Sequence, residues 1–376
     1  MTEAGAPQGL RRSPLDAVHR RSGAKLVEFG GWDMPVSYPL GTLDEHRACR
    51  TAAALFDVSH LGTVRVTGPG GFAALQGAFT NDLARIGPGR AQYTHLLDPD
   101  DASVVDDLII WWRPDDSFDV MPNASNTARV VAAILAAGDP HSCSAADVTS
   151  SRAVLALQGP TARAVLGTVS PDAAAVGRFR VAQATVSGVE VMVAGTGYTG
   201  EDGVELAVPV AAAAGVWQAL VDAGAVPAGL GARDTLRLES ALPLHGHELG
   251  AGITSDDAGL SWVVRADKGP FRGRAALLAT RATGGRHRLR GIATEGRRPP
   301  RDGSAVLTAD GVAVGKVSSG NFSPTLGHGI ALAFLGDLHA TPLPDGTPVE
   351  VDVRGRSIAG RLVEVPFYRR GGEGNA

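Results

Sequence analysis

The sequence predicts an α+β protein whose C-terminal part is a small β-barrel or sandwich. Before residue 285, helix-like and strand-like segments follow one another without the regular strand–helix–strand rhythm of a doubly wound parallel sheet. Beyond it the pattern changes to short strands. There Asp310-Gly311 lies between two short β-like runs, which is the strongest local signal for a hairpin.

The first predicted helix spans residues 43–56. Thr42 and Glu45 have the Thr-x-x-Glu spacing of a capping box, in which each side chain satisfies a free N–H at a helix start. Apolar and small residues recur behind it at helical spacing, at Cys49, Ala52, Ala53 and Phe56. We therefore expect one continuous helix here.

Two further helices are predicted over residues 123–137 and 210–223. Each is followed by a glycine, Gly138 or Gly224, at the position where a left-handed C-cap forms. Between the helices lie strand-like runs, at residues 63–66, 153–157 and 189–193.

The C-terminal region is predicted to be β throughout. Residues 305–314 form two short runs around the Asp-Gly turn, and residues 349–353 alternate strictly between apolar and polar. Short strands of this kind are typical of a small barrel or sandwich, which we assign to residues 285–370. The Arg- and Gly-rich stretch 283–287 is the expected linker.

Composition and charge exclude several classes of protein. The chain has 376 residues, of which 44% are hydrophobic and 20% charged, so it can form a large core. The net charge of -4 provides no basic field for nucleic acid. Cys49 and Cys143 do not make a disulfide scaffold, and no apolar run is long enough to span a membrane. We expect a cytoplasmic protein.

A glycine-rich loop at residues 195–200 matches the G-x-G-x-x-G pattern of dinucleotide-binding sites. Such a site needs a helix directly after the glycines to hold the pyrophosphate. Here Glu201-Asp202-Gly203 follows, and residues 204–208 are strand-like. We expect a strand–loop–strand unit, whose glycines allow a ligand to approach the backbone closely, and no nucleotide site.

Two histidine-containing motifs have simpler structural interpretations. Asp57, Ser59 and His60 are triad residue types, but neighbours in a chain point apart, so we expect a structural turn. Residues 245–248, His-Gly-His-Glu, are metal-ligand types without a further cluster to complete a coordination shell. We interpret this motif as a solvated loop or a partner-binding surface, and we predict no metal site.

The adjacent acids Asp106 and Asp107 are stronger functional candidates. They lead into a β-branched and aromatic run, residues 108–112, that is typical of a buried strand. Adjacent side chains on a strand face opposite ways, so one acid can enter the interior while the other stays in water. A buried carboxylate needs hydrogen-bond partners or a chemical role. The alternative is a solvated strand end with both acids outside.

Arg233 and Arg237 follow a glycine hinge and share one helical face because they are four residues apart. Asp234 can neutralise Arg237 three residues on, which leaves Arg233 to face an acidic ligand or Glu205. The alternative is an ion network internal to the protein.

Nine short motifs follow one another along the chain in a specific order and spacing. They are FGGWDMP (29–35), FDVSHLG (56–62), TND (80–82), VDDLI (105–109), LQGP (157–160), TGYTGEDGVE (196–205), AGLGARD (228–234), SGNFSPTL (319–326) and PFYR (366–369). Together they resemble the glycine cleavage T-protein family, the tetrahydrofolate-dependent aminomethyltransferases. The resemblance extends from Ser13 to Arg370.

This resemblance implies a three-lobed, clover-leaf fold around a central folate-holding cavity. Residues 13–282 would form the folate-binding region, as two interleaved α+β lobes, and residues 285–370 the β-barrel. The family's catalytic aspartate matches Asp107. Its folate-contacting residues match Tyr93, Asn123, Tyr198, Glu205 and Arg233.

The resemblance also implies a reaction. A one-carbon unit would move from the aminomethyl-lipoyl arm of lipoylated H protein to tetrahydrofolate, with release of ammonia. The chain departs from the family pattern at Ala102-Ser103, Trp111 and residues 254–257, which concerns the identity of the donor. Two alternatives therefore stay open: a folate-dependent demethylase of a small methylated donor, and a non-catalytic folate-binding protein.

A dense basic run near the start of the barrel region is a candidate docking site for an acidic H protein. Its members are Arg286, His287, Arg288, Arg290, Arg297, Arg298 and Arg301. The alternative interpretation of this run is a solvated loop.

Overall fold

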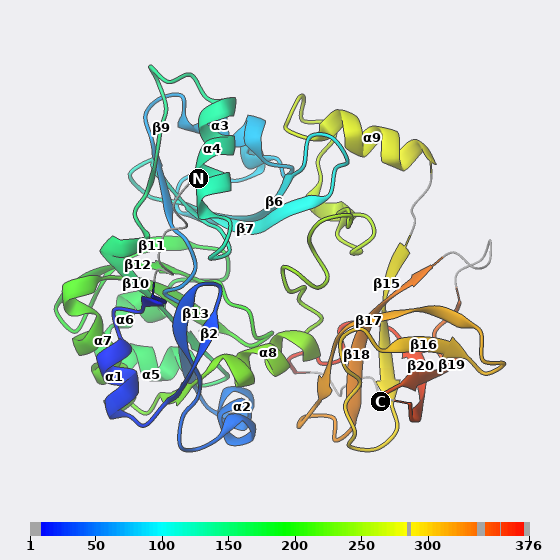
Figure 1. Cartoon of the computed structure of the whole chain (residues 1–376). Coiled ribbons are helices and arrows are strands. Elements are labelled where there is room, and N and C mark those ends of the chain that lie inside the picture. The colour runs from blue at the N-terminus through cyan, green and yellow to red at the C-terminus, as the bar shows by residue number, and fades with distance from the viewer. Residues whose placement is uncertain (1–8, 284–286, 337–342, 354, 372–376) are drawn as a thin grey trace, which may run out of the picture.

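The computed structural model describes residues 9–283, 287–336, 343–353 and 355–371. Three lobes surround a central region and give the molecule the clover-leaf shape that the resemblance implied (Figure 1). Two lobes are α+β and contain one large sheet each, and the third is a closed β-barrel. In the part of the chain that the structure describes, no helix combines the length and apolarity needed to cross a membrane.

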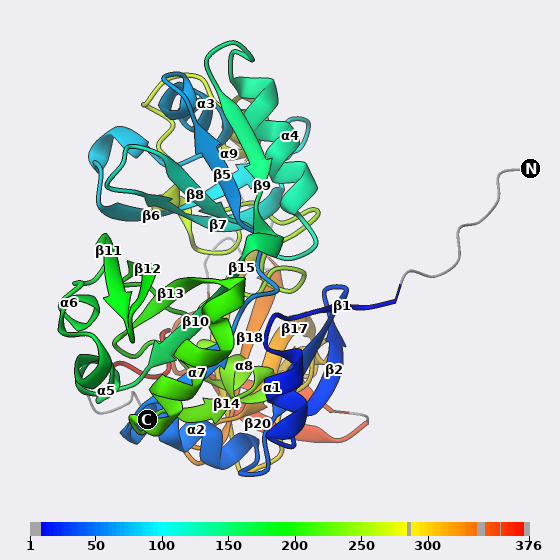
Figure 2. The ribbon, with the colours of Figure 1, turned by 90° about the vertical axis from the view of Figure 1, so that its left-hand side faces the viewer.

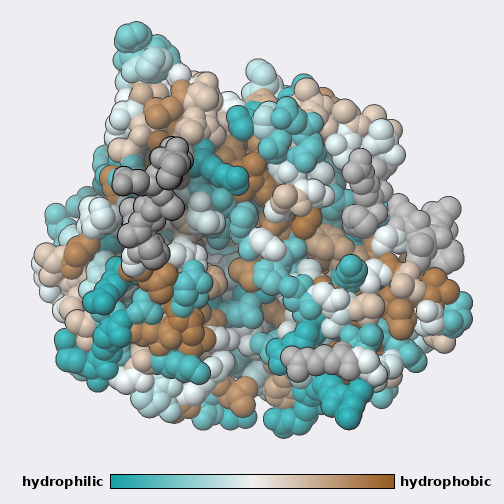
Figure 3. Space-filling model, in the orientation of Figure 1, coloured by the Kyte–Doolittle hydropathy of each residue, from teal (hydrophilic) through white to brown (hydrophobic). Residues whose placement is uncertain are grey.

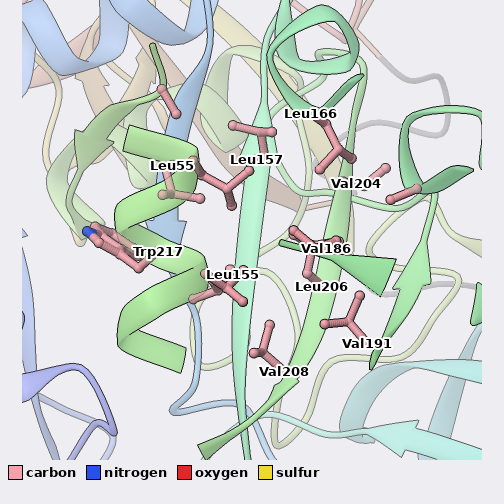
Figure 4. Packing of buried hydrophobic residues seen from close by; sticks show 14 of the residues in the cluster. Leu55, Leu155, Leu157, Leu166, Val186, Val191, Val204, Leu206, Val208 and Trp217 are labelled. Carbon is pink, nitrogen blue, oxygen red and sulfur yellow. The ribbon is translucent and has the colours of Figure 1, made fainter. Parts of the chain in front are cut away.

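The first lobe is built on a mixed six-stranded sheet. Its strands are β4 (Ala54–Asp57), β10 (Arg152–Gln158), β11 (Val181–Val186), β12 (Val189–Ala194), β13 (Gly203–Pro209) and β14 (Val226–Ala228), in the order β11-β12-β13-β10-β4-β14. Its helices are α1 (Asp16–Arg21), α5 (Ala162–Val169), α6 (Pro171–Ala174) and α7 (Ala213–Asp222). Leu155 on β10 pairs with Leu206 on β13, and both pack with Trp217 of α7 in one buried core (Figure 4).

The second lobe is an antiparallel five-stranded sheet covered by helices on one face (Figure 2). Its strands are β5 (Val64–Thr67), β6 (Arg90–Leu97), β7 (Val104–Trp112), β8 (Phe118–Met121) and β9 (Ser144–Asp147), in the order β6-β7-β8-β5-β9. Its helices are α3 (Gly71–Ala78), α4 (Thr127–Ala137) and α9 (Arg274–Thr283). Leu108 and Ile110 of β7 join the core under α3 and α4, whereas Trp111 faces the first lobe.

The third lobe is a closed six-stranded barrel. Its strands are β15 (His287–Thr294), β16 (Ala305–Thr308), β17 (Ala313–Phe322), β18 (Gly329–Gly336), β19 (Pro348–Asp352) and β20 (Ser357–Val363). The predicted hairpin around Asp310-Gly311 is confirmed, because β16 pairs antiparallel with β17 across that turn. The expected linker at 283–287 falls largely on residues 284–286, which lie outside the described residues.

A small sheet and two helices join the lobes. The sheet contains β1 (Arg11–Arg12), β2 (Lys25–Phe29) and β3 (Trp32–Ser37), and the helices are α2 (Thr42–Thr51) and α8 (Leu230–Glu239). Helix α8 contacts α2, β3 and the barrel strands β17 and β18, so it lies at the centre of the molecule. Short 3₁₀ turns occur at Leu83–Arg85, Thr149–Ser151, Val210–Ala212 and Ser261–Val263.

The predicted helix 43–56 exists, starting one residue earlier at Thr42, but its predicted end is wrong. Helix α2 stops at Thr51, and Phe56 belongs to β4, where pairing with β10 and β14 outweighs the helical spacing of the apolar residues. The capping box is also absent from this helix start. Gly41 is the N-cap, and Glu45 instead accepts hydrogen bonds from the backbone N–H groups of Tyr38 and Gly229.

The other two predicted helices exist with changed limits. Helix α4 begins at Thr127 instead of residue 123, because the preceding residues form a turn against β7. Gly138 has an extended backbone at φ −99°, so the predicted left-handed cap is wrong there. Gly224, at φ +105°, has the predicted positive φ after α7.

Candidate active site

The candidate site lies between the two large sheets. Ile109 and Trp111 of β7 and Ala156 of β10 contribute to one apolar core that joins the two lobes. Asp107 shares its strand face with Ile109, and Glu205 of β13 pairs directly with Ala156. The two acids therefore approach the same interlobe space from opposite sheets. The surface is hollowed where the three lobes meet (Figure 3).

The acidic pair is held by a network of side-chain amides. Asp106 is fully buried, and it accepts hydrogen bonds from Nδ2 of Asn123 at 2.8 Å and from Nδ2 of Asn126 at 2.9 Å. Asp107 is partly buried and accepts from the Tyr93 hydroxyl at 3.0 Å and from Asn123 Nδ2 at 2.9 Å. The predicted inward acid is thus Asp106. Asp107 is not simply solvated, because it is oriented by two donors.

Both acids have raised pKa values. Burial, reinforced by the neighbouring charge of Asp107, raises the pKa of Asp106 to about 8. Burial also raises the pKa of Asp107. Hydrogen bonds from Tyr93 and Asn123 and the positive charge of His245 oppose that increase, since each favours the ionised carboxylate.

Tyr93 connects Asp107 of β7 to His95, a buried histidine that lies on β6 together with Tyr93. Its hydroxyl lies 3.2 Å from Nε2 of His95, whose Nδ1 lies 2.9 Å from the Ser255 hydroxyl. Burial lowers the pKa of His95 to about 3, so this imidazole is neutral at physiological pH. The Tyr93 ring also packs 6.1 Å from the ring of Trp262, which is 57% exposed. The phenol is therefore fixed from both sides.

A second group of predicted residues lies on the first lobe and α8. The Arg233 guanidinium stacks 4.8 Å above the Tyr198 ring, and the Tyr198 hydroxyl donates to the Pro243 carbonyl. Glu205 is buried and accepts a hydrogen bond from the Thr196 hydroxyl. Burial lowers the pKa of Arg233, and the carboxylate of Glu205 opposes that decrease.

Arg233 retains unused donor capacity. Its Nη1 is buried and has no hydrogen-bond partner within the described residues. Buried polar groups are almost always paired, so an orphaned guanidinium nitrogen at a site indicates a position for a ligand acceptor.

The structure brings the two groups of predicted residues to one place. The charge of Asp107 raises the pKa of Tyr198, and Tyr198 in turn influences Tyr93, so these side chains lie within electrostatic reach of each other. Asn123 lies between the two acids of β7. Asp107, Tyr93, Asn123, Tyr198, Glu205 and Arg233 therefore border a common region between the lobes.

The predicted ion pair of α8 is confirmed, since Arg237 binds Asp234 at 2.8 Å. The interpretation of residues 245–248 as a solvated loop is wrong. Glu248 is fully buried and pairs with Arg237 at 3.0 Å, and His245 lies against β7 beside the acidic pair. Sequence reasoning missed His245, because nothing in its local pattern indicates which strand the loop meets.

Two other predictions hold. Asp57 is buried and binds Ser13, His19 and the backbone of Ser59, which is a structural turn. The glycine-rich loop 195–200 leads into β13 and not into a helix. A Cβ at Gly197 would lie 1.9 Å from the Gln158 side chain, so this glycine is required for close packing.

Among the described residues, no group of three or more His, Cys, Asp or Glu side chains could hold a metal ion.

Comparison with known proteins identifies the class. The family model of the GCVT N-terminal domain matches residues 15–268, and that of the glycine cleavage T-protein C-terminal barrel domain matches residues 287–369. The crystal structure of glycine cleavage system aminomethyltransferase T from Bartonella henselae superposes with a TM-score of 0.87 at 33% identity, covering 96% of this chain and 99% of that one. The fold is thus that of a T-protein transferase.

Curated relatives are similar in sequence to this chain along nearly its whole length. The aminomethyltransferase of Mycobacterium tuberculosis (strain ATCC 25618 / H37Rv) is 49% identical over 362 residues, 95% of this chain and 97% of the relative. That of Geobacillus kaustophilus is 45% identical over 368 residues, 96% and 99% respectively. The chain belongs to the glycine cleavage T-protein family, and its activity is that of an aminomethyltransferase of the glycine cleavage system.

Proposed function

We propose that this enzyme transfers the one-carbon unit from the aminomethyl-lipoyl arm of H protein to tetrahydrofolate, releasing ammonia and forming 5,10-methylenetetrahydrofolate. The observation that carries the proposal is the orientation of Asp107, which receives hydrogen bonds from Tyr93 and Asn123 between the two sheets. A fixed carboxylate of this kind suits a reaction in which positive charge develops on carbon.

The proposed folate residues fit the chemistry of a pterin. A pterin ring offers N–H and NH₂ donors together with carbonyl and ring-nitrogen acceptors. Glu205 supplies a carboxylate acceptor, and the orphaned Nη1 of Arg233 supplies a buried donor. Tyr93 and Tyr198 present aromatic faces, and Asn123 an amide. We propose that these five residues bind tetrahydrofolate, which is a co-substrate.

Asp107 is the proposed catalytic residue. Loss of ammonia from the protonated aminomethyl group breaks its C–N bond, the electron pair leaves with the nitrogen, and a thionium-like cation remains, whose carbon is bonded to the lipoyl sulfur. The ionised carboxylate of Asp107 stabilises that cation, and N5 of the folate attacks its carbon. The C–S bond then breaks with release of the lipoyl thiolate, and N10 attacks the resulting N5 iminium carbon to close the methylene bridge. Of the two protons lost by N5 and N10, one goes to the thiolate and the other to the released ammonia. Tyr93 and Asn123 favour the ionised form of Asp107 against the effect of burial on its pKa. Most of the acceleration comes from positioning.

The partner and the compartment are also part of the proposal. The enzyme would act with lipoylated H protein in the cytoplasm. The cytoplasmic assignment is supported by Cys49 and Cys143, which are both buried and free.

The basic run in sequence does not form one patch. Arg288 and Arg290 lie near the start of β15, whereas Arg297, Arg298 and Arg301 follow its end at Thr294, about 20 Å along the strand from Arg288.

Only the second part of that run stays a docking candidate. Arg290 is paired with Asp345 at 2.6 Å, and Arg286 lies outside the described residues. Arg297, Arg298 and Arg301 are exposed in the connection between β15 and β16. We propose this connection as the face that docks H protein.

The direct test supplies purified enzyme with tetrahydrofolate and aminomethyl-lipoyl H protein, and measures 5,10-methylenetetrahydrofolate and ammonia. We expect the two products in equal amounts, with no methylene product when H protein is omitted. Tetrahydrofolate binding without turnover would contradict the assigned donor, and small methylated compounds would then be tested in its place.

A further inference from the structure

The loop after α8 carries the His-Gly-His-Glu motif, which the proposed function leaves unused. Glu248 holds this loop from inside the protein. Its carboxylate accepts hydrogen bonds from the Leu244 backbone N–H at 3.0 Å, from Arg237 at 3.0 Å and from the Ser318 hydroxyl. The anchor joins the loop to α8 and to barrel strand β17, so the first histidine of the motif is presented from a fixed backbone.

His245 reaches the strand that carries the acidic pair. Its Nε2 lies 2.9 Å from the carbonyl oxygen of Val105, the residue directly before Asp106. Nε2 also lies 3.1 Å from Nδ2 of Asn126, whose two hydrogens are directed to the Val105 carbonyl and to Asp106. Since a carbonyl oxygen only accepts, Nε2 carries the hydrogen of its contact with Val105 and donates it. Protonation of the other ring nitrogen would make the side chain a cation. The imidazole therefore supports the strand at the point where the acids begin.

The side-chain amides of Asn126 and Asn123 connect the Val105 carbonyl to Asp107. Nδ2 of Asn126 donates to the Val105 carbonyl at 3.1 Å and to Asp106 Oδ1 at 2.9 Å. Nδ2 of Asn123 then bridges Asp106 Oδ1, at 2.8 Å, and Asp107 Oδ1, at 2.9 Å. A displacement of the Val105 peptide is thus transmitted to the carboxylate that we propose as catalytic.

When it is protonated, His245 would also place a positive charge near the acidic pair. The titratable groups around Asp107 are Tyr93 with His95 behind it on β6, Asp106 on β7, Tyr198 after β12 and His245 after α8. Burial has the largest effect on Asp107 and raises its pKa, whereas a charge on His245 lowers it. The tyrosines are neutral in the physiological range, and His95 is neutral as well.

We propose that His245 is a positioning residue for the one-carbon transfer, which fixes the backbone before the acidic pair and so holds the carboxylate of Asp107 in place through Val105, Asn126 and Asn123. This inference rests on the proposed function. It gives the loop motif a part in the reaction, since the Glu248 anchor holds the histidine beside β7.

Two variants separate the hydrogen bond from the charge. In His245→Gln the side-chain amide can still donate to the Val105 carbonyl, but no charge is possible. Without that charge Asp107 takes up a proton at a higher pH, so the acid limb of the kcat/KM profile moves to higher pH, by about one unit. Turnover on the alkaline side of that limb stays within about twofold of wild type. His245→Ala loses both functions, and kcat falls about tenfold or more at every pH.

His247→Gln is the matched control. Its imidazole belongs to the same loop but contacts the Ser318 carbonyl, at 2.7 Å, instead of β7. We expect its pH profile to equal that of the wild type, and thermal unfolding of all three variants shows whether each is folded.

Wild-type turnover is measured first, because absence of transfer counts against the proposed function itself. If the wild type turns over and the acid limb of His245→Gln does not move, a charge on His245 has no effect on Asp107. If His245→Ala also keeps its kcat, His245 has no positioning role, and the loop is structural only.

Discussion

Asp106 and Asp107 are adjacent residues of one strand with different surroundings. Asp106 is enclosed by Asn123 and Asn126, whereas Asp107 faces the space between the lobes beside Tyr93. Because the strand alternates, a single residue step separates a buried structural acid from a proposed catalytic one. The environment and not the residue type decides the role.

The raised pKa of Asp106 predicts a pH dependence of stability. An acid with a folded pKa of about 8 binds more protons in the folded than in the unfolded state between pH 4 and pH 8, so its contribution to stability decreases as the pH rises across that range. One such group changes the free energy of unfolding by at most about 1.4 kcal/mol per pH unit.

Asp106→Asn removes this titration. Its amide oxygen can still accept from Asn123 and Asn126, but its NH₂ would meet the Asn123 backbone N–H, which adds a constant penalty at all pH values. The difference in Tm between variant and wild type should therefore shift in favour of the variant from pH 5 to pH 8. A difference independent of pH would show that Asp106 is ionised throughout.

Part of the site was predictable from single residues. The pattern of Asp106-Asp107 before an apolar run indicated a buried acid, and the four-residue spacing of Arg233 and Arg237 indicated a shared helix face. The binding roles of the remaining residues came from the resemblance alone. His245 was missed because its partner, the Val105 carbonyl, is 140 residues away in sequence and carries no side-chain signal.

Strands were easier to predict than helix limits. Residues 153–157 and 189–193 lie within β10 and β12, because a β-branched, apolar run has few alternatives in a buried sheet. The helix predicted over 43–56 ended too late, because the strand β4 follows α2 after two residues. Residues 54–56 are as apolar as a buried helix would require, and their pairing with β10 makes them a strand.

The core of the first lobe depends on the contact between α7 and its sheet. Trp217 is almost completely buried and packs with Leu155 and Leu206 (Figure 4). We expect Trp217→Ala to lower the free energy of unfolding by about 3–5 kcal/mol, since it leaves a large cavity. Denaturant unfolding measures the change.

Trp262→Ala is the control, because that ring is largely exposed. It should change stability by less than about 1 kcal/mol. An equal loss in the two variants would contradict the assignment of Trp217 to a rigid core.

The arrangement of the three lobes is fixed by contacts at their meeting point. Glu239 at the end of α8 accepts hydrogen bonds from His46 and Arg50 on α2 and from Ser323 and Thr325 beside the barrel. The barrel itself was predictable from its short strands, but its position was not. That position depends on a buried ionic network between distant segments, which no local pattern reveals.

The proposed docking face predicts a partner-specific effect. Reversing the charge of Arg297, Arg298 and Arg301 together should raise the KM for H protein about tenfold at low salt, because charged rims steer association. The kcat and the KM for tetrahydrofolate should not change. Steady-state kinetics with each substrate varied in turn distinguishes these parameters.

Arg288→Glu is the matched control at the opposite end of β15. It should leave the KM for H protein within about twofold of wild type, since a charge about 20 Å away along the strand is largely screened. A rise with Arg288→Glu and none with the triple variant would place the docking face elsewhere.

The central claim is that Asp107 is the carboxylate that acts on the transferred carbon. The most direct measurement compares the formation of 5,10-methylenetetrahydrofolate by wild type, Asp107→Asn and Asp100→Asn, with tetrahydrofolate and aminomethyl-lipoyl H protein as substrates. Asp100 serves as the control because it is exposed in the loop between β6 and β7. We predict that kcat falls at least about 100-fold in Asp107→Asn, with little change in Tm, and stays unchanged in the control. Equal turnover by wild type and Asp107→Asn would contradict the account.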